Sequence, residues 1–371
     1  MNAMSKFDRI ALSLMCCAAF YALWLAAPRQ TFGANGQVRY VQRDKETGEY
    51  EEGTRSVSVS AMTADGVAVE YESKGEKKSA VLPAEQILWL QYEDEPLNLS
   101  AARVEIQVGN YEDALEKLGA IEEEIKEPAI QQELEWNRAY ATIQSALADS
   151  GKLESAAAVM KTFVEAYPDH YRFYDGNALL ADAAAALGRA PAAEKYYTAL
   201  TGAKSASYQA RGKVGLANLA LDADELDKAK SLFSEVADMA ELDGQLAGFD
   251  ARAAAQIGLA RVLSKQGDLD GALASLNALL DATPNSATRR QAIIYNAFGD
   301  VYAAAKKPEE AIVAYLHVDL LYPAARGERV KALKALVGLW REIGRTDRAV
   351  ETKRLLRDRF NVDVDAQGSG R

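Results

Sequence analysis

Between residues 97 and 360, apolar residues recur at intervals of three and four, which is the period of helices that bury one face. Short polar segments interrupt this pattern at similar distances along the chain. The first begins Gly109-Asn110-Tyr111, and the fifth begins Gly267-Asp268-Leu269. Seven such segments occur, each between two apolar-periodic stretches. The pattern therefore predicts seven antiparallel helix pairs that follow one another over residues 97–360.

Each polar segment repeats residues that suit a tight turn between two helices. Glycine accepts the left-handed backbone that ends a helix, although Asp224 and Lys306 replace it in the fourth and sixth copies. A small residue then stands where the second helix is expected to cross the first: Ala114, Ala156, Ala193, Ala229, Ala272, Ala311 and Ala349. Four residues later most copies carry a larger apolar residue: Leu118, Met160, Tyr197, Phe233, Leu276 and Tyr315. Lys353 takes this position in the last copy, as the polar outer face of a terminal repeat requires.

The repeats resemble the tetratricopeptide repeat family. The sixth copy matches the family pattern best, at Phe298-Gly299, Tyr302, Ala311, Tyr315 and Pro323. Successive alanines lie 36 to 43 residues apart, whereas the family unit has about 34 residues. Longer helices or loops are therefore expected, as in bacterial cell-envelope proteins of this family. The resemblance covers residues 97–360 and implies a curved α-solenoid, whose first helices line a concave groove that binds another protein.

Residues 35–94 carry the signals of short strands instead. Ser56 to Ser60 alternates with period two, and Asp65-Gly66 is a hairpin signal. A helical turn at residues 83–86 precedes the last strand, Ile87 to Tyr92. Five strands with a helical turn before the last resemble an SH3-like or Sm-like small barrel. The expected fold class is therefore mostly α, with a small five-stranded β module before the solenoid.

The chain begins with a segment typical of targeting. Lys6 and Arg9 precede residues 10–27, which carry no charge, and this order is typical of a secretory signal or a membrane anchor. We expect residues 1–34 to be either a cleaved signal peptide or a retained hydrophobic anchor helix. Both options place the protein in the cell envelope, exported to the periplasm or held at the cytoplasmic membrane. Residues 361–371 are expected to be a disordered tail.

Counting along the first helices places four polar side chains on the expected groove: Arg211, Asn218, Arg261 and Asn296. Arginine and asparagine supply hydrogen-bond donors in a defined geometry, so this set suits the backbone and a carboxylate of a bound peptide. A solvated groove wall without a ligand is the alternative interpretation. A second candidate surface is the basic face of the last helix, formed by Lys353, Arg354 and Arg357.

Composition and charge narrow the function further. The 371 residues carry a formal net charge of −11, which argues against nucleic-acid binding because that needs a basic surface. Cys16 and Cys17 are the only cysteines and lie in the N-terminal apolar segment, so cysteine chemistry is not available to the folded part. His170 follows a Pro-Asp turn and is expected to be exposed, whereas His317 is expected to be packed. Without a phosphate loop, nucleophile elbow or metal motif, we predict no enzyme activity, no cofactor and no metal site.

Two functions remain open on this basis. The first is a cell-envelope scaffold that binds a peptide or helix of another protein in the concave groove, and that contacts the membrane through its N-terminal segment if this is retained. The second is a binding module for an envelope polymer or an anionic lipid, which uses the β module and the basic last helix.

Overall fold

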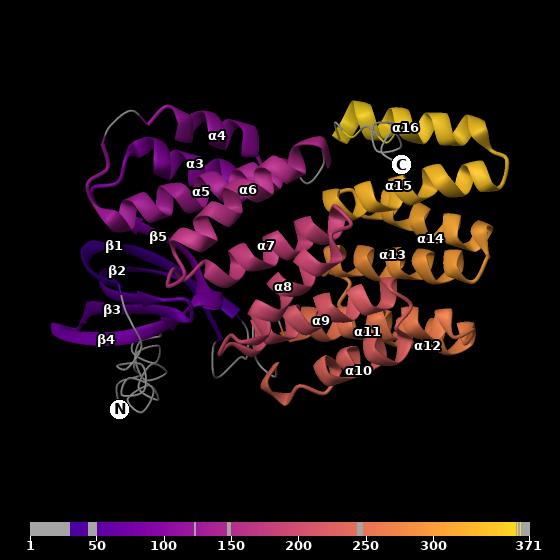
Figure 1. Cartoon of the computed structure of the whole chain (residues 1–371), viewed down its shortest axis with the longest axis horizontal. Helices are drawn as coiled ribbons and strands as arrows, with labels where there is room; N and C mark the ends of the chain where they lie inside the picture. Colours follow the sequence, from indigo (N-terminus) through magenta and orange to yellow (C-terminus); the bar gives the residue numbers. More distant parts are fainter. Residues whose placement is uncertain are drawn as a thin grey trace, which may run out of the picture. The chain divides into compact units, whose positions relative to one another are not determined.

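The computed structural model describes residues 30–43, 50–121, 124–146, 150–242, 248–360, 362 and 364 (Figure 1). In these ranges, five β-strands are followed by fourteen α-helices, α3 to α16. The chain divides into two compact units. The first contains the sheet and helices α3 to α8, the second contains α10 to α16, and α9 contributes residues to both. The predicted targeting segment at residues 10–27 lies outside the described residues.

An antiparallel sheet begins the described chain. Its strands are β1 (Gln30–Arg43), β2 (Tyr50–Thr63), β3 (Gly66–Ser73), β4 (Glu76–Pro83) and β5 (Ile87–Tyr92), and the 3-10 helix η2 (Ala84–Gln86) precedes the last strand. They pair in the order β4-β3-β2-β1-β5. The predicted five strands and helical turn are thereby confirmed. β1 and β2 are longer than their alternating segments indicate, because they pair with each other from Gln30–Met62 to Arg43–Tyr50.

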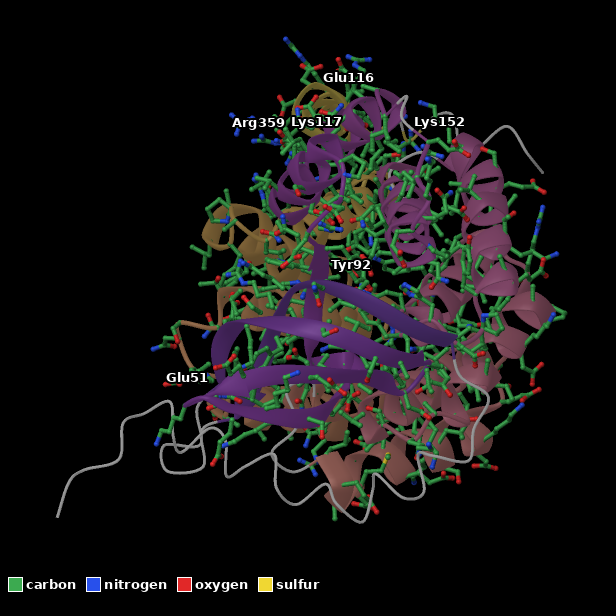
Figure 2. All side chains as sticks on the ribbon, turned by 90° about the vertical axis from the view of Figure 1, so that its left-hand side faces the viewer. Glu51, Tyr92, Glu116, Lys117, Lys152 and Arg359 are labelled. Atoms are coloured by element: carbon green, nitrogen blue, oxygen red, sulfur yellow. The ribbon has the colours of Figure 1, made fainter. Side chains whose placement is uncertain are left out.

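The sheet shares its core with the first helices. The helices of the first unit are α3 (Leu97–Val108), α4 (Tyr111–Gly119), α5 (Pro128–Ala146), α6 (Ser150–Ala166), α7 (Phe173–Ala186) and α8 (Ala190–Thr201). Val59 and Leu90 of the sheet belong to one buried cluster with Leu99 of α3 and Leu118 of α4. Figure 2 shows Tyr92, the last residue of β5, between the sheet and these helices. The β module is therefore part of the first unit rather than a separate body.

A buried ion pair fixes the junction between β5 and α3. Arg103 Nη2 donates to Glu95 Oε2 over 2.8 Å, and both side chains are almost fully buried. Arg172, before α7, donates to the backbone carbonyl of Leu88 on the edge strand β5 and to Asp175 Oδ2 over 3.0 Å. Charged side chains taken out of water need such partners, so these bonds fix where the sheet meets the helices.

The remaining helices continue the pairs. They are α9 (Ala206–Asp222), α10 (Leu226–Ala237), α11 (Gly248–Lys265), α12 (Leu269–Asp281), α13 (Thr288–Ala304), α14 (Pro308–Leu321), α15 (Arg326–Glu342) and α16 (Thr346–Phe360), with the 3-10 helix η3 (Ala240–Leu242) between α10 and α11. The predicted repeat of helix pairs is thereby confirmed. Val362, within the predicted tail, is buried against the last helices.

The turns inside the pairs adopt the left-handed geometry that the repeats indicate. Four glycines have positive φ there: Gly109, Gly188, Gly267 and Gly344. Asp224 and Lys306, which stand in for glycine, adopt the same geometry with φ of 63° and 60°. Gly151 differs, because it lies in the first turn of α6 rather than between two helices. The position thus requires the backbone shape even where the side chain makes it unfavourable.

Burial confirms the predicted helix crossings. All seven repeat alanines are at most 2% exposed. The larger apolar residues four positions later are also buried, the most exposed being Tyr197 at 8%. In the first six pairs the second helix therefore packs on its neighbours through one small and one large side chain. Within the described ranges, none of the helices combines the length and apolarity that crossing a bilayer requires.

Candidate functional site

Two residues predicted for the groove meet in the second unit. Asn218 lies on α9 and Arg261 on α11, which are the first helices of neighbouring pairs. Arg261 Nη1 donates a hydrogen bond to Asn218 Oδ1 over 3.2 Å. This bond orients the guanidinium and leaves its other N–H groups available, because within the described residues it is the one hydrogen bond of Arg261 and no carboxylate pairs with it.

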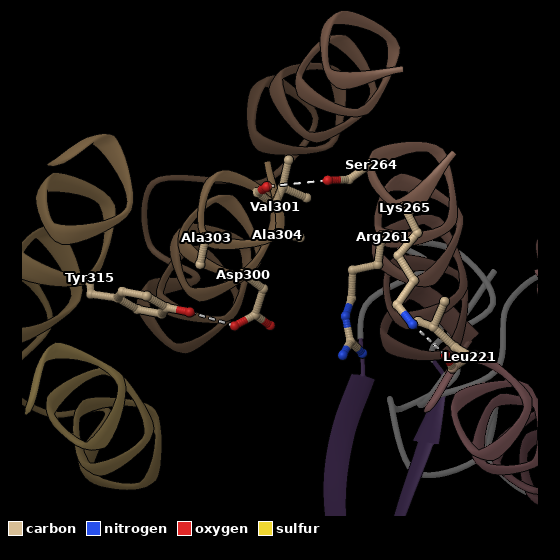
Figure 3. A pocket seen from close by; sticks show the side chains of 9 residues that line it. All are labelled: Leu221, Arg261, Ser264, Lys265, Asp300, Val301, Ala303, Ala304 and Tyr315. Atoms are coloured by element: carbon tan, nitrogen blue, oxygen red, sulfur yellow. Dashed lines mark hydrogen bonds between the residues drawn. The ribbon is translucent and has the colours of Figure 1, made fainter. Parts of the chain in front are cut away.

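A cavity of about 270 Å³ lies beside Arg261. Its lining residues come from α9, α11, α13 and α14: Leu221, Arg261, Ser264, Lys265, Asp300, Val301, Ala303, Ala304 and Tyr315. Figure 3 shows Arg261 and Lys265 reaching from α11, and Asp300 from α13, toward the same space. Ser264 Oγ donates to the Val301 carbonyl over 3.2 Å and joins α11 to α13. The cavity therefore has a largely apolar wall with a few charged side chains.

The negative charge in the cavity is already compensated. Tyr315 OH donates to Asp300 Oδ1 over 2.6 Å, and Lys331 Nζ of α15 donates to Oδ2 over 3.1 Å. Burial, and then the negative charge of Asp300, raises the pKa of Tyr315 well above its ordinary value of 10, so the phenol stays protonated and keeps donating.

The second cation of the cavity is also paired. Lys265 Nζ donates to the Leu221 carbonyl and to Asp224 Oδ1, each over 2.9 Å. Among the described residues, Arg261 is therefore the charged group of the cavity wall that forms no ion pair, since Asp300 pairs with Lys331. A guanidinium in a half-buried, largely apolar wall suits a carboxylate or another anionic group of a ligand.

The other two predicted groove residues lie elsewhere. Asn296 of α13 is fully buried, and its Nδ2 donates to the backbone carbonyl of Glu328 over 3.1 Å and to the Oε2 atom of that residue over 2.9 Å. It therefore joins α13 to α15. Arg211 is exposed on α9, seven residues before Asn218. Neither residue lines the cavity.

Arg261 is the one lining residue in the predicted set, and two of the residues missing from that set, Lys265 and Tyr315, place polar groups at the cavity. Lys265 follows Arg261 by four residues and so lies on the same face of α11, a spacing that the sequence already contains. Tyr315 stands on the second helix α14, and its ring lies against Gly299 of α13, where a Cβ atom would come within 2.5 Å of the ring. Its hydroxyl reaches the cavity through this close approach, which the sequence alone does not indicate.

The predicted basic face lies on α16. Arg354 Nε donates to Asp358 Oδ2 over 3.2 Å, and Arg357 Nε lies 3.5 Å from Oδ1 of the same carboxylate. Lys353 is partly exposed on this helix. The shared carboxylate lowers the positive charge that an anionic lipid or polymer would meet.

The imidazoles do not contribute to the cavity. The expected exposure of His170 is wrong, because this residue is 1% exposed in the first unit. His317 is packed as expected and stacks on Tyr295 with ring centroids 4.9 Å apart. Within the described ranges, no group of three or more His, Cys, Asp and Glu side chains suits a metal ion.

Family models match two overlapping parts of the chain. A tetratricopeptide repeat-like domain matches residues 182–319, and a tetratricopeptide repeat matches residues 145–210. Every residue that lines the cavity falls within the first match. Among curated proteins, no sequence matches this chain.

Solved structures share the helical fold at low sequence identity. The apo form of the quorum sensor NprR from B. thuringiensis aligns with a TM-score of 0.50 at 15% identity, over 70% of this chain and 74% of that chain. A tetratricopeptide repeat protein from Parabacteroides merdae ATCC 43184 gives 0.47 at 15%, over 70% and 90%. A Rap protein complexed with competence and sporulation factor gives 0.45 at 14%, over 70% and 74%. At such identities the likeness concerns the fold alone.

Proposed function

Residues 145–319 match models of the tetratricopeptide repeat, and we propose from that premise that this chain is a non-enzymatic scaffold of the cell envelope. The fold supports protein–protein interaction, since stacked helix pairs offer an extended surface to a partner. The proposed binding surface is the one formed by the first helices of the pairs, α9, α11, α13 and α15. The proposed ligand is an extended peptide or a helix of another protein.

The observation that carries this proposal is the cavity beside Arg261. Asn218 orients the guanidinium of Arg261, and among the described residues no carboxylate forms an ion pair with this guanidinium. A carboxylate of the partner, from an acidic side chain or from the end of its chain, would accept hydrogen bonds from the remaining N–H groups of Arg261. Apolar atoms of the partner would contact Val301, Ala303 and Ala304. Such charge-assisted hydrogen bonds contribute about 1.5–3 kcal/mol each.

The proposed location rests on the first residues of the chain. Lys6 and Arg9 followed by the uncharged residues 10–27 favour export or anchoring. A protein-binding surface held in the envelope would assemble other proteins there.

The binding proposal is tested by photo-crosslinking in living cells. A photoreactive amino acid replaces Ala304, which lines the cavity, and crosslinked proteins are identified by mass spectrometry. We expect discrete crosslinked proteins, and we expect Arg261→Ala to reduce their yield about tenfold or more, in line with the loss of a charge-assisted hydrogen bond. Asn218→Asp should also reduce the yield, because it places a competing carboxylate beside Arg261.

Matched controls separate this effect from a loss of folding. Arg348→Ala removes an equal charge from the exposed side of α16, and its crosslinks at position 304 should equal those of the wild type. Circular dichroism establishes that every variant is folded. Equal crosslinking by folded Arg261→Ala and by the wild type, or no crosslinked protein at position 304, would overturn the proposed site.

A further inference from the structure

Helix α3 carries apolar residues on two opposite faces. Leu99, Ala102 and Ile106 face the core that the first helices share with the sheet. A second apolar row consists of Leu97, Ala101, Val104 and Val108, hereafter the outer row. At 100° per residue the outer row spans about 60° and lies opposite the buried face. A helix that packs on one side only needs one apolar face, so α3 has a second one without a described partner.

The outer row is exposed. Leu97 is 88% exposed, Val104 59% and Val108 66%. α3 is the first helix of the first pair, and the outer helices of a repeat array are expected to present polar residues to water. The last helix α16 follows that rule, with Val350 as its one exposed large apolar residue among those described. The two terminal helices therefore differ, and α3 is the one that departs from the expected polar face.

The spacing of the outer row suits a second helix. Its members are separated by four, three and four residues, which is the spacing of the a and d positions along a coiled-coil contact. Such a row fits against another helix with the same spacing. A symmetric pair of copies provides that helix, because a twofold interface brings the same patch together from both sides.

The flanks of the outer row favour a second copy of the same chain. Asn98, Ser100 and Gln107 are polar without charge, and Glu105 is the acidic residue among them. Lys117 Nζ of α4 lies 3.5 Å from Glu105 Oε1 and compensates its charge within one chain. The flanking residues of α3 itself therefore bring no uncompensated like charge to a contact between two copies, and like-charge repulsion is the usual obstacle to self-association of a charged helix.

We propose that the outer row of α3 is a self-association surface, on which α3 of a second copy packs in antiparallel orientation. A helix of this length is about 18 Å long, so the contact lies near the lower end of specific interfaces, about 1,000 Å² in total. The dimer is accordingly weak and reversible, with dissociation in the micromolar range. The net charge of −11 opposes association at a distance, so added salt strengthens the dimer by screening.

Sedimentation velocity tests this inference on the full-length chain, in a fixed concentration of mild detergent that keeps residues 10–27 soluble. Across roughly a hundredfold range of protein concentration, we expect a monomer–dimer equilibrium that shifts toward dimer as salt is raised. Val104→Glu places two charges in the centre of the contact and should weaken the dimer at least tenfold. Val350→Glu is the matched control on α16, at a residue that is 63% exposed, and should leave the dimer unchanged.

A second measurement tests the orientation. In a Cys16→Ser/Cys17→Ser background, Ala101→Cys combined with Val104→Cys should give a disulfide-linked dimer under mild oxidation, because antiparallel packing about the centre of the row brings position 101 of one copy near position 104 of the other. A wild-type chain that stays monomeric over the whole range would overturn the proposal. Equal association of Val104→Glu and the wild type would also overturn the proposal, because residues 10–27 or another surface would then drive association.

Discussion

At the scale of single residues, His170 shows how tertiary packing reverses a local expectation. Its side chain lies between Phe163 and Tyr171, with ring centroids 5.2 and 4.7 Å away. Nε2 is 3.7 Å from Oε1 of the buried Glu133, and Nδ1 accepts a hydrogen bond from the Arg172 backbone N–H over 3.1 Å. Burial, and then the positive charge of Arg172, lowers the pKa of His170 from 6.5 to about 3.

This lowered pKa predicts that acid destabilises the protein well above pH 3. The unfolded chain binds a proton near pH 6.5 and the folded chain does not, so stability falls as pH decreases from about 6.5 toward 3. One such group contributes a loss of about 2 kcal/mol between pH 7.5 and pH 5. We expect His170→Asn, whose Oδ1 keeps an acceptor near the position of Nδ1, to lose less stability over this interval than the wild type. Urea unfolding at both pH values provides the measurement.

Glu133, the acid beside His170, affects stability in the opposite direction as pH falls. Burial raises the pKa of Glu133, so its protonation favours the folded chain as pH falls. Comparing His170→Asn with the wild type removes this shared contribution. An identical loss of stability in His170→Asn and in the wild type would contradict the assignment to His170.

At the scale of elements, the sixth helix pair depends on a glycine packed against a large side chain. Within the sixth pair, the ring of Tyr315 on α14 lies against Gly299 of α13, and a Cβ atom there would come within 2.5 Å of the ring. The Tyr315 hydroxyl also donates a hydrogen bond to Asp300, the next residue of α13. The ring therefore has little room to move, and the crossing of α13 and α14 depends on the missing side chain.

We predict that Gly299→Ala destabilises the second unit. Overpacking of this kind costs about 1–3 kcal/mol, which exceeds the gain of about 0.5–1 kcal/mol from replacing a helical glycine by alanine. Gly338→Ala on α15 is the matched change, because nothing lies within 4 Å of its added Cβ atom, and it should raise stability by the smaller amount. Thermal unfolding followed by circular dichroism compares the two. A melting temperature of Gly299→Ala at or above that of Gly338→Ala would contradict this account.

At the scale of the whole molecule, the proposed envelope location depends on residues that precede the sheet. We predict that alkaline phosphatase fused after residue 364 is active in a bacterial host, because that enzyme needs the disulfide-forming compartment outside the cytoplasm. Deletion of residues 10–27 should abolish the activity while the fusion still accumulates. The mass of the mature N-terminus then distinguishes a cleaved signal from a retained anchor. Full activity of the deletion fusion would contradict the proposed location.

Much of the fold follows from local pattern. The helix pairs, six of the seven left-handed turns and the buried alanines were predictable because a repeated unit shows the same periodicity seven times, and each copy supports the assignment of the others. The five strands followed from alternation and turn residues in the same way. The lengths of β1 and β2 did not, because strand ends are set by pairing with another strand rather than by the strand itself.

The candidate site was predictable only in part. Asn218 and Arg261 were found by counting along helices, because equivalent positions of neighbouring first helices face the same side. Asn296 occupies such a position too, yet it is buried against Glu328 because α15 passes close by. In the cavity, Lys331 compensates the charge of Asp300, whereas among the described residues no carboxylate pairs with Arg261. This pairing could not be predicted, because it depends on distances between residues of three helices.

The sequence by itself determined the repeat, the element types and the small residues at the crossings, since these are properties of periodicity and composition within short stretches. Only the tertiary structure decided that the sheet shares a core with α3 to α5, that His170 is buried beside Glu133, and which face of α3 is left in water. The physical reason is that burial and pairing of charge depend on which surfaces meet. These tertiary contacts join residues that are far apart in the chain, so a local sequence pattern does not predict them.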